Sequence, residues 1–168
     1  MTPLKIEGYT NIFIGDHVLI QEYTWLAAIK LTNADTTILK IGDGTNIGHF
    51  NHIYATKEIV FGRNVLTADK VYVSDNLHAY ENIALPIIEQ PIKQLKGVSI
   101  GDGAWIGENV CIIGASVGKG SVIGANSVVT KDIPEYCVAV GSPAIVIKRY
   151  CKESGIWRKT DKNGLFLI

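Results

Sequence analysis

The feature that most constrains this chain is an aliphatic residue followed by glycine, a pair that recurs in register. The pairs are Ile14-Gly15, Ile41-Gly42, Ile47-Gly48, Phe61-Gly62, Ile100-Gly101, Ile106-Gly107, Val117-Gly118 and Ile123-Gly124. A small or β-branched residue stands four positions after most of these aliphatics, at Val18, Thr45, Val65, Ala104, Val110, Ser121 and Ser127. The resulting period of six fits neither the 3.6 residues of an α-helix turn nor the simple alternation of a hairpin.

A period of six fits a triangular solenoid. Three six-residue units make one coil, short strands form its flat sides, and Gly or Asn at the corners accepts backbone angles that β-branched residues resist. Ile41, Ile47, Ile53 and Ile59 would then line the interior, where burial is worth roughly 1.5–3 kcal/mol per side chain once neighbouring coils stack. An antiparallel sandwich would instead show turn signals about every 8–12 residues. The sequence therefore predicts one all-β solenoid domain over residues 1–168.

The period is interrupted in three places. Between Ile20 and Ile41, the segment 32–37 reads as a polar turn or a displaced coil. Between Ile53 and Phe61 the spacing is eight, so a small bulge or loop must absorb two residues. The largest excursion covers about residues 75–97. Because a long loop on a compact scaffold commonly carries function, the site is expected there.

After the excursion the repeat resumes at Ser99 and continues to about Val129. The C-terminal segment, about residues 144–168, is irregular. Within 144–152 we expect a strand that turns into a helical turn. The apolar ending, 165–168, is expected to pack on the body of the protein or on a neighbouring subunit.

Charge and cysteine content narrow the class of protein. The chain has 16 basic and 16 acidic residues, so it has no broad field that would attract nucleic acid or an anionic membrane, and small or neutral ligands fit better. Cys111, Cys137 and Cys151 are odd in number and form no Cys-x-x-Cys pair, which argues against disulfides and zinc. The first eight residues lack a signal-peptide stretch, and no apolar run approaches the roughly twenty residues of a membrane span. We therefore expect a soluble, cytoplasmic protein.

Three segments carry a family resemblance: 97–107 (GVSIGDGAWIG), 123–134 (IGANSVVTKDIP) and 141–144 (GSPA). They resemble the hexapeptide-repeat acetyltransferases, closest to the polysaccharide and galactoside/maltose O-acetyltransferases, over nearly the whole stretch from Ile14 to Arg149. The resemblance implies a left-handed parallel β-helix, whose hand is an exception to the usual right-handed crossover and does not follow from the period. It also implies a homotrimer with active sites between subunits, acetyl-CoA as acyl donor, and a sugar or glycan hydroxyl in surface polysaccharide biosynthesis as acceptor.

The resemblance also assigns roles to individual residues. The family's catalytic histidine sits on a loop ahead of the Ile-Gly-x-x-x-Trp-Ile-Gly coil, which is the place of His78. The positions that match the family's coenzyme-binding residues are Trp105, Ala125 and Thr130, and more loosely Lys131, Ser142, Lys148 and Arg149. One departure is the spacing of five between Ile112 and Val117, where the family usually has six, so the coil facing the pantetheine arm is expected to be slightly repositioned.

Acyl transfer from a thioester to a hydroxyl needs a base, because a neutral alcohol is a poor nucleophile at pH 7. Histidine, with an ordinary pKa near 6.5, suits that task. Asp75, Glu81 or a main-chain carbonyl would orient the imidazole. A backbone N–H at a tight glycine corner would stabilise the oxyanion.

Asn51, Asp75 and Asn76 are candidate contacts for the acceptor. His49 and His52 lie three apart, which on a β coil does not place both on one face, and no Cys or carboxylate cluster accompanies them. Structural or substrate-contacting roles fit these histidines better than a metal site.

Two other functions stay open on the sequence alone. N-acetylation of an amino sugar needs the same base and the same donor. A non-catalytic β-helix assembly subunit needs neither, and it would not require a histidine on a long loop.

Overall fold

The computed structural model of the protein describes residues 5–161 and 164–167. Residues 1–4, half of the N-terminal stretch that carries no signal-peptide pattern, lie outside the described residues, as does Ile168 at the end of the apolar tail. Within the described ranges, no helix is long and apolar enough to cross a membrane.

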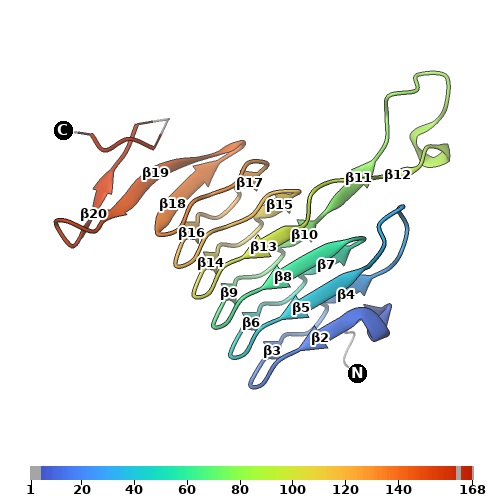
Figure 1. Ribbon diagram of the computed structural model, residues 1–168, viewed down its shortest axis with the longest axis horizontal. Helices are drawn as coiled ribbons and strands as arrows, with labels where there is room; N and C mark the ends of the chain where they lie inside the picture. The colour runs from blue at the N-terminus through green and yellow to red at the C-terminus, as the bar shows by residue number, and fades with distance from the viewer. Residues whose placement is uncertain (1–4, 162–163, 168) are drawn as a thin grey trace.

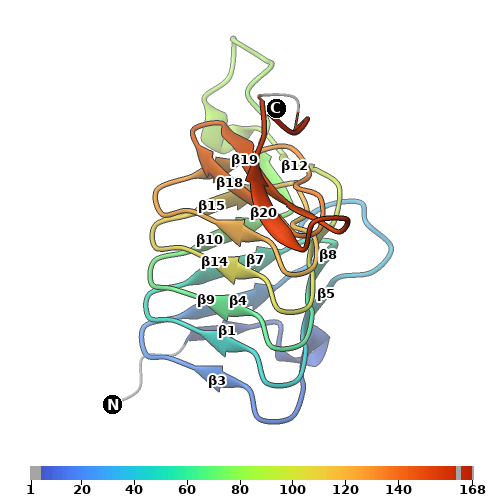
Figure 2. The same cartoon turned by 90° about the vertical axis from the view of Figure 1, so that its left-hand side faces the viewer.

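In residues 5–161, short strands wind into triangular coils whose sides stack into three parallel sheets (Figures 1 and 2). Sheet A contains β1 (Lys5–Glu7), β4 (Trp25–Ala28), β7 (His52–Ala55), β10 (Tyr72–Ser74), β15 (Cys111–Ile113) and β17 (Val128–Val129). Sheet B contains β2 (Ile12–Ile14), β5 (Ile38–Ile41), β8 (Glu58–Phe61) and β13 (Val98–Ile100). Sheet C begins with β3 (Leu19–Ile20), β6 (Asn46–Ile47), β9 (Leu66–Thr67), β14 (Trp105–Ile106), β16 (Val122–Ile123) and β18 (Cys137–Gly141).

The inward aliphatics of successive coils stack in register and form one core. Ile41 pairs with Phe61, and Phe61 pairs with Ile100 on the next coil. Ile41, Ile47, Ile53 and Ile59 are each at most 1% exposed, as predicted. The fold is therefore the expected left-handed parallel β-helix.

All variation in coil length falls at the corner between sheets A and B, which we call corner AB. From Ile14 to Val129, the inward residues facing B, C and A follow each other at intervals of six, as in Ile41, Ile47 and Ile53. From the inward residue of A to that of B the interval is 8 between Ile53 and Phe61, 27 between Val73 and Ile100, and 5 between Ile112 and Val117. The two extra residues expected after Ile53 and the shortened coil after Ile112 are both present. Every excursion therefore leaves the β-helix along a single edge.

Two of these excursions are long. Residues 32–37, expected as a polar turn or displaced coil, lie in the loop 29–37 between β4 and β5. Residues 75–97, which we call the arm, form the antiparallel hairpin β11 (Asn76–His78) and β12 (Ile92–Gln94), with a short 3-10 helix η2 (Ile87–Glu89) on the return towards β12. Another short 3-10 helix, η1 (Tyr9–Asn11), precedes β2. Figure 1 shows the arm projecting well beyond the coils.

The C-terminal segment differs from the prediction. β19 (Ala144–Cys151) stays extended to its end and pairs antiparallel with both β18 and β20 (Ile156–Lys159), so the expected helical turn is absent and a tight turn at 152–155 takes its place. Pairing on both sides satisfies the backbone of β19, which removes the advantage of helical hydrogen bonds. The chain reverses into β19 through a cis bond between Ser142 and Pro143. Leu165 and Leu167 of the apolar tail are half or more exposed in the single chain.

Candidate active site

His78 ends the outgoing strand of the arm and is exposed. Its backbone pairs with Ile92 across the hairpin, and the next residue continues the ladder, with Ala79 N–H donating to Pro91 O at 3.0 Å. Within the described residues, the imidazole has no hydrogen-bond partner. An exposed imidazole with both ring nitrogens free can accept a proton from an incoming group.

The outer half of the arm is held by its own side chains. Gln90 is 8% exposed, and its amide donates to Asn82 O at 2.9 Å and to Leu85 O at 3.1 Å while accepting from Asn82 N–H. Lys93 and Glu81 form an ion pair across the hairpin. The hydrogen bond from Lys93 lowers the pKa of Glu81 to about 2. Glu81, which was one candidate to orient His78, is therefore engaged with Lys93 in the single chain.

Asp75 lies at the base of the arm and is fully buried. Its Oδ2 accepts from the backbone N–H groups of Lys57 and Glu58, both at 2.7 Å. Its Oδ1 accepts from the backbone N–H and the hydroxyl of Thr56, at 2.8 and 3.0 Å, and from the amide of Asn76 at 3.1 Å. Both oxygens of the carboxylate thus accept hydrogen bonds from Thr56, Lys57 and Glu58 at corner AB of the preceding coil, and no hydrogen bond joins Asp75 to His78.

The two asparagines expected to contact the acceptor lie in different surroundings. Asn51 is 1% exposed at the corner between sheets C and A, where Nδ2 donates to Gly48 O at 2.7 Å and to Ala68 O at 3.1 Å, and Oδ1 accepts from Val71 N–H at 2.8 Å. Asn76 is 8% exposed on β11 and donates to Tyr54 O at 3.3 Å. Asn76 shares a strand with His78, whereas Asn51 belongs to the wall of the β-helix.

His52 and His49 are separated as the sequence suggested. The ring of His52 stacks on Trp25 with centroids 4.1 Å apart, and burial lowers its pKa, assisted by the positive charge of Lys5. His49 sits at the corner, 3.4 Å from a carboxylate oxygen of Asp69. Among residues 5–161 and 164–167, no three His, Cys, Asp or Glu side chains are grouped so that they could hold a metal ion.

The residues matched to the donor lie on sheet C and on the coils that follow it. Trp105, on β14 between Leu66 and Val122, is 51% exposed. Ala125 and Ser142 are exposed at turns, Thr130 is exposed directly after β17, and Lys148 and Arg149 lie on β19. The structure brings Lys131 and Arg149 together, because both line a hollow of about 300 Å³ that also involves Ile145. These two cations suit the phosphates of a coenzyme.

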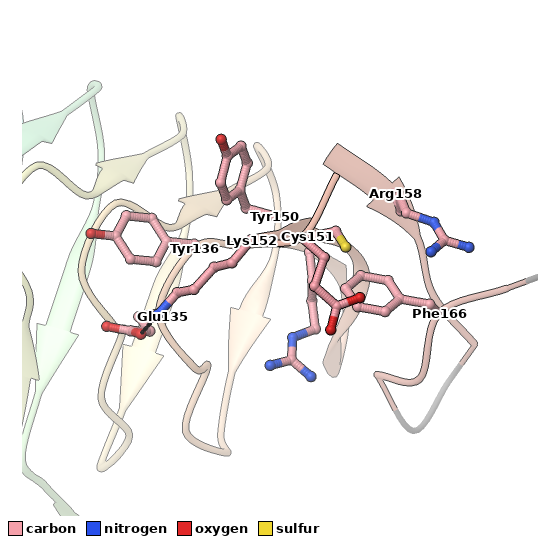
Figure 3. Close-up of a pocket in the computed structure, with 9 residues that line it drawn as sticks. Glu135, Tyr136, Tyr150, Cys151, Lys152, Arg158 and Phe166 are labelled. Atoms are coloured by element: carbon pink, nitrogen blue, oxygen red, sulfur yellow. Dashed lines mark hydrogen bonds and ion pairs between the residues drawn. The ribbon is translucent and has the colours of Figure 1, made fainter. Parts of the chain in front are cut away.

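Sequence reasoning missed two features near the arm and the donor-binding residues. The first is Gln94, which opposes Asn76 across the hairpin and contacts three separate segments. The second is a hollow of about 410 Å³ beside the C-terminal hairpin, lined by Tyr136, Tyr150, Arg158 and Phe166 among others (Figure 3). Neither feature belongs to the six-residue repeat, so the periodic pattern carried no signal for it.

A parallel β-helix of hexapeptide coils that bears an exposed histidine on a long arm is the architecture of a hexapeptide-repeat acyltransferase. Residues 97–131 match the sequence family described as the hexapeptide repeat of succinyl-transferase. The chain is 32% identical, over 94% of its own length and 81% of the relative's, to WbbJ of Escherichia coli K12, which is named as an O-acetyl transferase of lipopolysaccharide biosynthesis. A Mycobacterium tuberculosis protein named as an acetyltransferase is 40% identical over 82% of this chain and 49% of its own length.

Two solved structures share the fold at low sequence identity. The N-acyltransferase AntD from Bacillus cereus, in complex with dTDP and 3-hydroxybutyryl-CoA, aligns with a TM-score of 0.73 and 19% identity over 90% of this chain and 79% of its own. PerB from Caulobacter crescentus, in complex with CoA and GDP-perosamine, aligns with a TM-score of 0.61 and 20% identity over 86% of this chain and 54% of its own. The chain belongs to the hexapeptide-repeat acetyltransferase family, and it is an acyltransferase.

Proposed function

We propose that the chain, acting as one domain, transfers an acetyl group from acetyl-CoA to a sugar hydroxyl in surface polysaccharide biosynthesis, with His78 as general base. The observation that carries the proposal is the free imidazole of His78 on a hairpin that both Gln90 and Asp75 hold in place. The relative named for lipopolysaccharide O-acetylation, which this chain matches over most of its length, favours the hydroxyl acceptor.

His78 accepts the hydroxyl proton as the acceptor oxygen bonds to the thioester carbonyl carbon. The carbon–sulfur bond then breaks, and the coenzyme leaves as a thiol after receiving a proton. Lys131 and Arg149 hold the phosphates of the donor, and Trp105 packs beside its pantetheine arm. Ala125, Thr130, Ser142 and Lys148 complete the donor contacts. Asn76, on the same strand as His78, contacts the acceptor, while Asp75 fixes the base of the arm.

The working form is a cytoplasmic homotrimer in which the arm of one subunit reaches the donor-binding coils of the next. Two exposed apolar surfaces support this assembly. One is the outer half of the arm, where Tyr80, Ile83 and Ile88 are each more than 60% exposed. The other follows sheet C through Leu19, Leu66 and Trp105, each about half exposed. Apolar surface of this kind is commonly buried between subunits. Light scattering is expected to give three times the 18.3 kDa mass of one chain.

Purified protein is incubated with acetyl-CoA and a panel of sugars and sugar nucleotides, while free thiol release is followed. His78→Ala is expected to lower kcat about 10²–10⁴-fold. The matched control is His17→Asn, which changes an exposed histidine at a corner with φ +56°, a conformation that Asn accepts. A His78→Ala enzyme as active as wild type would reject His78 as the base. Absence of acceptor-dependent thiol release with every sugar would favour an assembly subunit.

N-acetylation of an amino sugar is the second candidate, favoured by the N-acyltransferases AntD and PerB that share the fold. The product decides between the two. An O-acetyl ester is cleaved by mild alkali and the acetyl mass is lost, whereas an N-acetyl amide keeps it. Turnover restricted to amino sugars, with an alkali-stable product, would show that the acceptor group is an amine and not a hydroxyl.

A further inference from the structure

The base of the arm contains a partly buried polar network that joins three corner AB segments. The amide nitrogen of Gln94 donates to Asp75 O at 2.7 Å and to Leu95 O at 3.1 Å. Its amide oxygen lies 2.6 Å from the hydroxyl of Thr32 and 3.0 Å from the hydroxyl of Thr56. Thr32 belongs to the loop 29–37, Thr56 to the next corner and Gln94 to the arm. One side chain thus links segments up to 62 residues apart.

The orientation of this amide is determined by its partners. Two carbonyl oxygens face one end of the Gln94 side chain, so that end must be the NH₂ group, which is its only donor. The oxygen at the other end then needs a donor. The hydroxyl of Thr56 has a single proton and two acceptors at 3.0 Å, Asp75 Oδ1 and Gln94 Oε1, so it can serve only one of them at a time. Thr32 is therefore the donor that keeps Gln94 satisfied in either case.

This network lies close to His78 along the hairpin. Gln94 opposes Asn76, and His78 follows two residues later on the same face of the same strand. At about 3.3 Å per strand residue, the Cα atoms of Asn76 and His78 are separated by roughly 7 Å. Gln94 also anchors Asp75 O, which accepts the N–H of Leu95 at 2.9 Å and so ties the two ends of the arm together. A shift at Gln94 therefore moves the strand that carries the imidazole.

We propose that Gln94 and Thr32 are positioning residues, which hold the arm so that His78 meets the acceptor hydroxyl in the reactive geometry. This inference rests on the proposed role of His78 as base. It gives the loop 29–37, which belongs to a different coil, a part in catalysis without contact with either substrate. Because a misplacement of about 1 Å can cost about 10² in rate, loss of this hold is expected to act on kcat.

The test variant is Thr32→Val, which keeps the shape of the side chain and removes the hydroxyl. Its kcat is expected to fall about 10–100-fold, with the KM for acetyl-CoA within twofold of wild type. Thr32→Ser restores the hydroxyl and is expected to return kcat to within about threefold. The control is Thr36→Val, an exposed position on the same loop, which is expected to match wild type. Gln94→Leu is expected to resemble Thr32→Val or to be more severe.

Hydrogen exchange of two arm amides gives a readout that does not depend on chemistry. The N–H groups of Leu95 and Ala79, bonded to Asp75 O and Pro91 O, are expected to exchange faster in Thr32→Val than in wild type. Unchanged kcat in Thr32→Val, equal losses in Thr36→Val, or no rescue by serine would overturn the inference while leaving His78 as the base. Wild-type activity in His78→Ala would instead reject the proposed function, whatever Thr32→Val does.

Discussion

Replacing Asn51 with alanine distinguishes two roles for this residue. The sequence suggested contact with the acceptor, whereas the structure indicates that Asn51 stabilises the wall of the β-helix. The side chain is 1% exposed and makes three hydrogen bonds, to Gly48 O, Ala68 O and Val71 N–H. Together they join the corner of one coil to the next coil. If Asn51 holds the wall of the β-helix, its loss reduces stability, whereas loss of a substrate contact raises the acceptor KM.

The magnitude follows from what alanine leaves behind. Val71 is 1% exposed, so its backbone N–H loses its partner without gaining water, at a cost of about 1–3 kcal/mol. Gly48 O keeps a second donor, the hydroxyl of Thr24 at 3.0 Å, and loses little. Ala68 O loses a bond of 3.1 Å, worth about 0.5–1.5 kcal/mol. The total is about 2–4 kcal/mol, or on the order of 5–15 °C in Tm for a chain of this size.

Unfolding is measured by heat and by urea at one fixed subunit concentration, because assembly stabilises the folded state by mass action. The matched control is Asn33→Ala, an exposed position on the loop 29–37, which is expected to change stability by less than about 0.5 kcal/mol. Acceptor and donor KM are measured on the folded enzyme at low temperature. If the Asn51→Ala protein unfolds at the same temperature and urea concentration as wild type while its acceptor KM rises, the structural role is refuted.

Two further experiments test the core and the pH response. Ile53→Ala, at a position 1% exposed, is expected to lower the free energy of unfolding in urea by about 2–5 kcal/mol. The control Ile83→Ala, at an exposed position on the arm, is expected to leave the free energy of unfolding of a single chain almost unchanged. Equal losses in the two variants would contradict the observed packing. Burial lowers the pKa of His52 below its ordinary 6.5, so the unfolded chain binds the proton first and stability falls as pH drops through about 6.5. Thermal unfolding between pH 7.5 and 5.5 should show a smaller decline for His52→Phe than for wild type, and identical declines would disprove this source of pH dependence.

Much of the fold could be predicted because the β-helix is periodic. The interval of six identified the inward residues, the eight residues from Ile53 to Phe61 indicated an insertion, and the break after Val73 located the arm. The strand β19 could be assigned only partly. Its sequence suits a strand or a helix, and the choice was made by hydrogen bonds to β18 and β20, which lie outside the segment and are not visible in its own residue pattern.

The site could be predicted less well, because its decisive contacts cross between coils at corner AB. Nothing local marks Asp75 as a buried cap of Thr56, Lys57 and Glu58, since an aspartate in a loop reads as exposed and available to ligands. Gln94 poses the same problem. Three of its partners lie 19, 38 and 62 residues away, and these separations depend on loop lengths that the repeat does not set.

In each aliphatic-glycine pair, glycine is required by close packing between coils and not by a positive φ angle. The positive φ values fall further along each corner, at glycine and asparagine but also at Phe50 and Lys70, which adopt φ of 56° and 57°. Gly62 has no positive φ, yet a Cβ there would lie 2.7 Å from the backbone N of Asp102 on the next coil. Stacked coils approach each other so closely at this position that any side chain would separate them. The motif therefore reports the contact between neighbouring coils, and this is why it predicted the solenoid so well and the arm, where no coil stacks, so poorly.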